Sequence, residues 1–172
     1  MTRLSIAALD AADDAGAAAA LAPLFEGAPR FLALLAAARP FGTEGALFDR
    51  AREICLAMPE DEQVELIDAH PRIGAPPGSV SAQSFREQGY DRERSRGETE
   101  AELDRLNAAY EARFGFRFVV FVAGRPRAAI VPVMEERLAG DRETEMRAAL
   151  RDIVAIAQDR WRKLVLNPEV AR

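Results

Sequence analysis

The feature that most constrains the fold is one apolar stripe running through residues 142–166. Its members follow 4-3-4-3-4 spacing, which places them on one face of an α-helix: Met146, Leu150, Ile153, Ala157, Arg160 and Leu164. A stripe of this length needs apolar partners on other elements, and most of the remaining chain also has helical periodicity. The stripe therefore favours an all-α bundle.

Capping and breaking residues mark the ends of the other expected helices. Thr43 is a plausible N-cap, Pro59 precedes three acids typical of a first helical turn, and Gly115 ends a long amphipathic helix. Pro132 must lie in a first turn, because an interior proline costs about 3 kcal/mol. Helices are expected at residues 16–25, 28–42, 43–58, 59–70, 84–88, 99–115, from about 128, and 142–166.

The stretch "FRFVVFVAGR" breaks this helical rhythm with a run of β-branched and aromatic residues. Such a run is typical of a buried extended segment, and no partner strand is visible elsewhere in the sequence. We therefore predict a single all-α domain over residues 1–172, a multi-helix bundle with one short extended segment near residues 116–123.

Composition excludes several classes of function. With a net charge of -5 and no basic stripe, the chain is not expected to bind nucleic acid. One cysteine, Cys55, and one histidine, His70, leave no internal disulfide and almost nothing to build a metal centre, so no metal is expected. The N-terminus fails as a signal peptide and no apolar run could span a membrane, which predicts a cytoplasmic protein.

His70 is the sole imidazole, and it stands directly before Pro71 at the predicted end of a helix. Leu66 and Ile67 lie four and three residues before it, so all three share one face and the ring points inward or into a cleft. Histidine exchanges protons near neutral pH, which suits an acid/base catalyst. The alternative is a hydrogen-bonded core or capping histidine.

The stretch "SFREQ" places Ser84, Glu87 and Gln88 at i, i+3 and i+4. On a helix these side chains bring a hydroxyl, a carboxylate and an amide to one face, which suits a small, flat ligand rich in N–H and C=O groups. The alternative is an ordinary helix start with Ser84 as N-cap and Glu87 completing a capping box.

Arg160 is the one charged member of the C-terminal apolar stripe. A charge there is costly unless it meets an anion, and an inward-facing guanidinium matches a substrate carboxylate. The alternative is an arginine that snorkels or pairs with a structural acid. Arg72 is more typical of an exposed, solvated arginine than of an anion ligand, and Cys55 and Trp161 are expected to pack.

Together these motifs resemble one family, the 2-oxo-4-hydroxy-4-carboxy-5-ureidoimidazoline (OHCU) decarboxylases of urate breakdown. The resemblance spans nearly the whole chain and combines "RPFG" (39–42), "AHPRIG" (69–74), "SFREQ" (84–88), "LNAAYEARFGFRFVVFVAGR" (106–125) and "IAQDR" (156–160). The chain departs from the family at "EQGYD", in the short loop after "HPRIG" and at the proline of "AAIVPVM".

The resemblance implies an all-α homodimer that converts OHCU to (S)-allantoin without a cofactor, a carboxy-lyase acting on a small ureidoimidazoline. By this analogy His70 is the catalytic acid/base, Glu87 orients it or the substrate, and Arg160 takes an anionic or carbonyl oxygen. The remaining residues implied to bind the substrate are Pro71, Ser84, Phe85, Arg86, Gln88, Phe118, Val119, Val120, Phe121 and Val122.

Two other functions are compatible with the sequence. One is a decarboxylase or hydrolase of a related ureido or purine-ring compound. The other is a non-catalytic helical binding protein on the same fold, for which a change at His70 would cause no loss of function.

Overall fold

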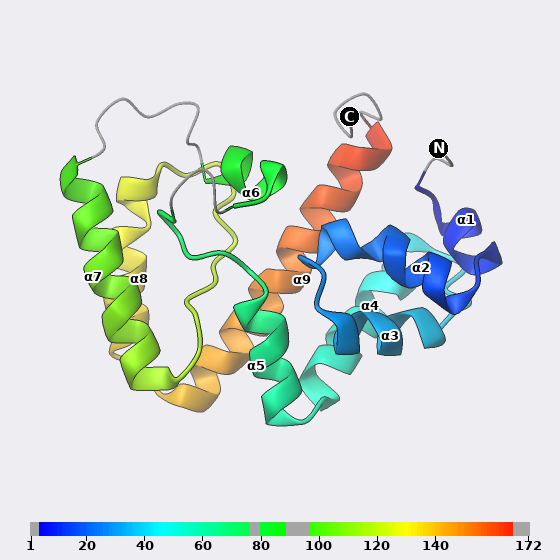
Figure 1. Ribbon diagram of the computed structural model, residues 1–172, viewed down its shortest axis with the longest axis horizontal. Helices are drawn as coiled ribbons and strands as arrows, with labels where there is room; N and C mark the ends of the chain where they lie inside the picture. Colours follow the sequence, from blue (N-terminus) through cyan, green and yellow to red (C-terminus); the bar gives the residue numbers. More distant parts are fainter. Residues whose placement is uncertain (1–3, 76–79, 89–96, 167–172) are drawn as a thin grey trace. The chain divides into compact units, whose positions relative to one another are not determined.

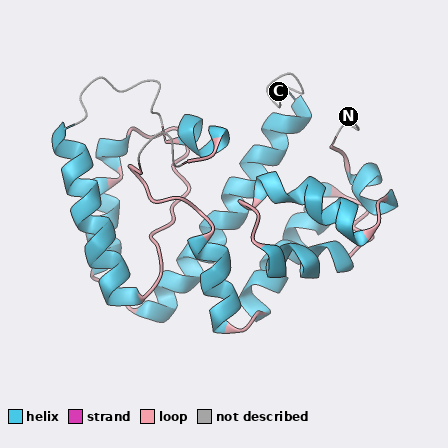
Figure 2. Cartoon of the chain, in the orientation of Figure 1, coloured by secondary structure: helices cyan, strands magenta, loops and turns pink. Residues whose placement is uncertain are grey.

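The structure, a computed structural model, describes residues 4–75, 80–88 and 97–166 (Figure 1). Within these ranges the chain forms helices joined by loops and contains no strand (Figure 2). The α-helices are α1 (Ile6–Ala11), α2 (Asp14–Leu21), α3 (Pro29–Ala37), α4 (Glu44–Ala57), α5 (Glu60–Asp68), α6 (Ala82–Glu87), α7 (Gly97–Phe114), α8 (Val131–Leu138) and α9 (Arg142–Leu166). The all-α prediction is confirmed, and only α1 was not predicted.

The chain divides into two compact units, which we describe separately. The first unit comprises Met1–Ala69 and Ile153–Arg172, and the second comprises His70–Asp152. Helix α9 contributes to both, because the division falls within it. None of the helices in the described ranges is both long and apolar enough to cross a membrane.

In the first unit, α2 packs against α3, and α3 also contacts α4 and α5. Helix starts are satisfied by side chains: the Thr43 hydroxyl accepts the Ala46 N–H at 3.1 Å, as the sequence predicted, and Ser5 caps α1 in the same way. The apolar core includes Leu21, Leu24, Phe25, Phe31, Leu35, Leu47, Phe48, Leu66, Ile67 and Ile153.

The "RPFG" turn of the first unit is held by acids near the N-terminus. Both oxygens of the Asp10 carboxylate accept backbone N–H groups, those of Phe41 and Gly42, at 2.8 and 2.9 Å. The Arg39 guanidinium donates to the Asp13 carbonyl and to the Asp14 carboxylate. These contacts give this motif a structural role, since they close the connection between α3 and α4.

In the second unit, α7 packs against α8 (Figure 1). Pro132 lies in the first turn of α8, as predicted, although the helix expected from about Ala128 is divided into a 3-10 turn, Arg127–Ala129, and α8. Besides α6 and the first part of α9, this unit contains two segments without regular secondary structure, residues 70–75 and 116–122. The second of these is the predicted extended segment. The residues of "EQGYD" that follow Gln88 lie outside the described ranges.

Candidate active site

The loop that carries His70 follows directly after α5. The imidazole is buried, with 3% of the residue exposed, and Pro71 is half-buried. The loop turns at Gly74, whose φ of 79° favours glycine. A Cβ at this position would also lie 3.1 Å from Leu103 Cδ1 on α7. Glycine therefore permits both the turn and the close approach of the loop to α7.

Amide side chains from two helices fix the backbone of this loop. The Gln88 Oε1 atom accepts the Gly74 N–H at 2.9 Å, and its Nε2 donates to the Arg72 carbonyl at 3.2 Å. From α7, Asn107 Nδ2 donates to the Ile73 carbonyl at 2.9 Å. The Asn107 Oδ1 atom is buried and has no hydrogen-bond partner within the described ranges, so it remains available to a water molecule or a ligand.

Arginines hold the two ends of the same stretch. Arg117 Nη1 donates to the His70 carbonyl at 3.1 Å, and Arg72 forms a two-bond pair with the Glu111 carboxylate on α7. The Arg72 side chain is about half exposed, at 48%. The backbone around His70 is thus bound by three side chains, of Gln88, Asn107 and Arg117, and the last two were not singled out from the sequence.

Helix α6 delivers part of the predicted polar face. Ser84 and Gln88 are both buried, at 3% and 4% exposure, and Glu87 and Phe85 are half-buried, whereas Arg86 is exposed. The N-cap is Ser81, whose hydroxyl accepts the Ser84 N–H at 3.1 Å. The alternative that made Ser84 the N-cap is therefore wrong, because the helix begins three residues earlier than "SFREQ" suggested.

The 116–122 segment is buried over most of its length: Phe118, Val119, Val120 and Val122 are at most 7% exposed, and Phe121 is half-buried. Three of its carbonyls accept arginine donors, Val119 from Arg137 and both Phe121 and Val122 from Arg125. Within the described ranges, the backbone N–H groups of Val119 and Val120 make no hydrogen bond. These two donors can therefore bind a ligand.

A buried polar cluster beside this segment was missed by sequence reasoning. The Tyr110 hydroxyl donates to Glu145 at 2.7 Å, and Arg137 pairs with both Glu145 and Asp152. Burial, and then the hydrogen bond to Glu145, raise the pKa of Tyr110. Burial also raises the pKa of Asp152, against the opposing charge of Arg137. Only the tyrosine stood within a recognised motif.

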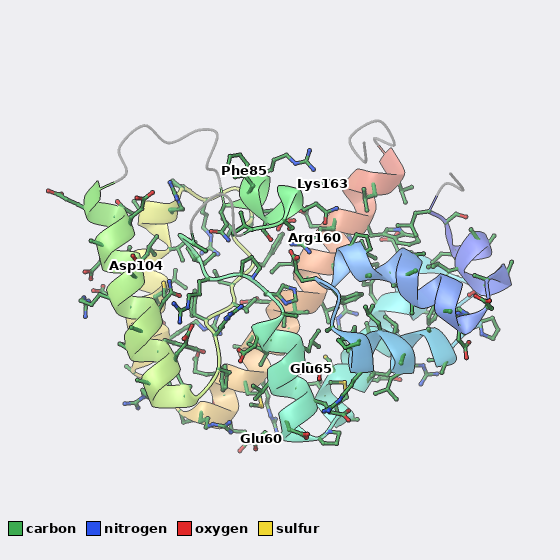
Figure 3. All side chains as sticks on the ribbon, viewed as in Figure 1. Glu60, Glu65, Phe85, Asp104, Arg160 and Lys163 are labelled. Atoms are coloured by element: carbon green, nitrogen blue, oxygen red, sulfur yellow. The ribbon has the colours of Figure 1, made fainter. Side chains whose placement is uncertain are left out.

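Arg160 belongs to the first unit, on α9 (Figure 3). It is 2% exposed, and its guanidinium donates to the carbonyls of Pro23 and Leu24 and pairs with Glu26 at 2.7 Å. Of the two alternatives left open by the sequence, pairing with a structural acid is the one present. The Glu26 backbone has a φ of 54°, so the pair holds a residue in the left-handed region.

Cys55 and Trp161 pack in the core of the first unit, as predicted. The cysteine is 1% exposed, and burial raises the pKa of its thiol to about 12. The indole of Trp161 meets Phe48 edge-to-face at 6.2 Å. Both side chains therefore have a packing role in this unit.

No group of three or more potential metal-binding side chains (histidine, cysteine, aspartate or glutamate) occurs within the described ranges. The polar groups of the 70–75 loop, α6, Asn107 and the 116–122 segment include an imidazole, a hydroxyl, amides, a carboxylate and backbone N–H groups. Such a set can hold the ring of a polar heterocycle by hydrogen bonds and exchange a proton with it.

Comparison with known proteins agrees with this chemistry. An OHCU decarboxylase of Haloferax volcanii is 28% identical over 92% of this chain and 94% of its own length. The uric acid degradation bifunctional protein PucL of Bacillus subtilis is 33% identical over 84% of this chain. The chain spans only 26% and 29% of the length of the two Bacillus bifunctional relatives that it matches.

Solved structures give the same result. A crystal structure of OHCU decarboxylase in the presence of (S)-allantoin matches with a TM-score of 0.65 and 25% identity, covering 82% of this chain and 94% of that one. The sequence profile of OHCU decarboxylase matches residues 10–162, which is most of the chain. This chain therefore belongs to the OHCU decarboxylase family.

Proposed function

We propose that this protein decarboxylates OHCU to (S)-allantoin in urate breakdown. The observation that carries the proposal is the family match over residues 10–162, which includes the buried His70 in its anchored loop. The polar groups around that loop suit the substrate, whose ring and ureido group offer N–H and C=O groups rather than a phosphate or a strong base.

The reaction needs little beyond orientation and proton transfer. The bond to the carboxylate breaks, CO2 leaves, and the electron pair forms a C=C bond to the neighbouring ring carbon while the nitrogen of the former C=N group takes up a proton. Loss of the hydroxyl proton and protonation of the neighbouring ring carbon on one face then give the carbonyl and the stereocentre of (S)-allantoin. Because the substrate itself accepts the electron pair, the proposed reaction requires no metal or organic cofactor.

In this proposal His70 is the acid/base group, and Glu87 orients the imidazole or the substrate. A positioned acid/base group typically contributes about 10²–10⁴-fold in rate. Fixing the His70 backbone through Arg117 supports the role, since the imidazole can then adopt few positions.

Binding of the ring is assigned to neutral hydrogen-bonding groups. These are the Ser84 hydroxyl, the remaining capacity of the Gln88 amide and the backbone N–H groups of Val119 and Val120. The other predicted contacts are made by Pro71, Phe85, Arg86, Phe118, Phe121 and Val122. A substrate role for Arg160 is a separate prediction, because its guanidinium already pairs with Glu26.

Circular dichroism of the product formed from freshly generated OHCU tests the proposal. OHCU decays unaided to racemic allantoin, so an enzyme that controls the protonated face must build a signal of one sign faster than this background. Dialysis against a chelator should leave the rate unchanged. If the protein gives only the racemic background, the proposed function is wrong.

The family resemblance further implies a homodimer, and the cytoplasmic location expected from the sequence is part of the same proposal. Cys55 is buried, so that dimer is not expected to depend on a disulfide. Light scattering during size-exclusion chromatography, with and without reductant, measures the assembly directly. An active species with the mass of one chain would contradict the dimer.

A further inference from the structure

Arg137 on α8 lies at the centre of the buried polar cluster in the second unit, and the proposed chemistry does not use it. Its Nε donates to Glu145 at 2.8 Å, while Nη1 donates to the Val119 carbonyl at 2.9 Å and to Asp152 at 3.2 Å. The same Glu145 oxygen accepts the Tyr110 hydroxyl. Side chains from α7, α8 and α9 thus converge beside the 116–122 segment.

This cluster holds the segment at successive points. Arg137 binds the Val119 carbonyl, and its guanidinium lies 4.7 Å from the centre of the Phe118 ring. Val119 itself is 4% exposed. The carbonyl side of the segment is therefore fixed by the cluster, while the Val119 and Val120 N–H groups make no bond within the described ranges.

Stability alone is a weak reason for such an arrangement. The Arg137 and Glu145 side chains are 14% and 5% exposed, and taking two charges out of water costs free energy that their attraction only partly returns. Well-packed apolar residues could fill the same volume at no loss of stability. What they could not do is bind a backbone carbonyl and so set the position of the peptide that follows it.

We propose that Arg137 is a positioning residue for the decarboxylation. Together with Glu145, Tyr110 and Asp152, it fixes the Phe118–Phe121 backbone so that its free N–H groups meet the substrate ring. This inference rests on the proposed function. A misplacement of about 1 Å can lower a rate about 10²-fold, so loss of the guanidinium should reduce turnover without removing any group that touches the substrate.

Arg142 on α9 supplies a matched control in the same unit. Its Nε donates to the Phe114 carbonyl at 2.8 Å, and its guanidinium lies 5.5 Å from the centre of the Phe116 ring. Arg142→Met and Arg137→Met both remove an arginine–carbonyl bond and an arginine over a phenylalanine ring, and Arg137→Met also breaks the pairs with Glu145 and Asp152. Only Arg137→Met removes these contacts from the Phe118–Phe121 segment.

The experiment combines steady-state kinetics on fresh OHCU with amide hydrogen exchange of the full chain. For Arg137→Met we expect kcat/KM to fall about 10- to 100-fold, mainly through kcat, because the ring is held but misplaced. Peptides covering residues 118–122 should exchange faster. For Arg142→Met we expect near-native kinetics and exchange in these peptides, with only a lower unfolding temperature.

Two milder variants keep the test decisive if Arg137→Met does not fold. Arg137→Lys keeps the charge but loses the planar fork that binds Glu145 and Val119 together, and Tyr110→Phe removes only the hydroxyl bound to Glu145. Both should exchange faster at 118–122 and lose less activity than Arg137→Met, with Arg137→Lys recovering part of the rate.

Three results would overturn the inference. One is folded Arg137 variants with native kcat/KM and native exchange at 118–122. Another is an equal kinetic loss in Arg142→Met, which would indicate general destabilisation. The third is a wild-type protein without turnover, which defeats the proposed function itself; in that case the exchange data still show whether Arg137 fixes the segment.

Discussion

In the first unit, helices and N-caps such as Thr43 satisfy backbone polar groups, and side chains such as Asp10 and Arg160 bind the short connections between the helices. In the second unit, two whole segments without regular secondary structure, residues 70–75 and 116–122, are held by side chains. There, Gln88 and Asn107 bind the 70–75 loop, and Arg137 binds the 116–122 segment. A helix uses its own N–H and C=O groups and leaves few for a ligand. A segment held from outside by side chains can keep some of these groups free.

The buried arginines of the two units also differ in what they bind. Arg160 in the first unit holds the carbonyls that follow α2 and pairs with Glu26, a residue with no predicted role in the chemistry. Arg137 in the second unit holds a carbonyl of the segment proposed to bind the substrate. Changes in the first unit should therefore act on stability, and changes in the second should act on turnover.

The largest expected effect is at His70. Replacing it with asparagine keeps some shape and hydrogen bonding but removes proton transfer, so kcat should fall about 10²–10⁴-fold while the protein stays folded. The initial rate of the (S)-allantoin dichroism signal measures this. Wild-type turnover by His70→Asn would show that His70 does not transfer the proton, and it would contradict the assignment of catalysis to the second unit.

The next effect concerns the Arg160–Glu26 pair of the first unit. Arg160→Met leaves the Glu26 carboxylate buried without its cation, which should lower the free energy of unfolding by about 3–5 kcal/mol. Urea denaturation measures the loss. The double variant Arg160→Met/Glu26→Gln should recover part of the lost free energy of unfolding, because the side chain at position 26 is then uncharged.

The same pair of variants tests the substrate role predicted for Arg160. If Arg160 only supports the fold, the double variant should be folded and active. A stable double variant with a strongly raised KM would instead show that Arg160 also binds the substrate, and the division between the two units would need revision.

A smaller effect is expected for two amide side chains that bind backbone carbonyls, Asn107 in the second unit and Gln63 in the first. Asn107→Ala in the second unit frees the Ile73 carbonyl near His70 and should lower kcat/KM about tenfold by loosening the loop. Gln63→Ala in the first unit frees the carbonyls of Cys55 and Leu56 and should cost about 1 kcal/mol of stability with native kinetics. Equal kinetic losses in both variants would contradict the comparison.

The smallest effect is the pH dependence caused by Cys55. Its pKa is raised from 9.0 to about 12 in the folded protein, so between these values the unfolded chain loses a proton that the folded chain keeps. Stability should therefore fall as pH rises from 9 towards 12, by about 1 kcal/mol at pH 10 relative to Cys55→Ala. Thermal unfolding of both proteins at pH 8 and pH 10 measures the difference, and identical slopes would contradict it.

Local sequence patterns were sufficient to predict most of the helices. The 142–166 stripe, Thr43, Pro59 and Gly115 act on the residues next to them, so their consequences can be read within a few turns of chain. Helix α1 was missed because its six residues are too few to show a clear period. The start of α6 was misplaced because Ser81 and Ser84 are equally suitable caps by type.

The candidate site was predicted only in part. His70 and Ser84 were singled out because a lone histidine before proline and a polar i, i+3, i+4 set are local features, and the family resemblance implied the role of each. Asn107 and Arg117 were missed as loop anchors, because each lies more than thirty residues along the chain from the carbonyl that it binds.

The sequence by itself determined that this chain is helical, where its long helices begin and end, and which family it resembles. Only the tertiary structure decided that Arg160 meets Glu26, that Gln88 binds the loop next to His70, and that Arg137 holds Val119. The physical reason is that periodicity and capping are interactions between near neighbours in the chain. Pairing of a buried charge or a free carbonyl depends on which distant side chain the packed helices bring within hydrogen-bond distance.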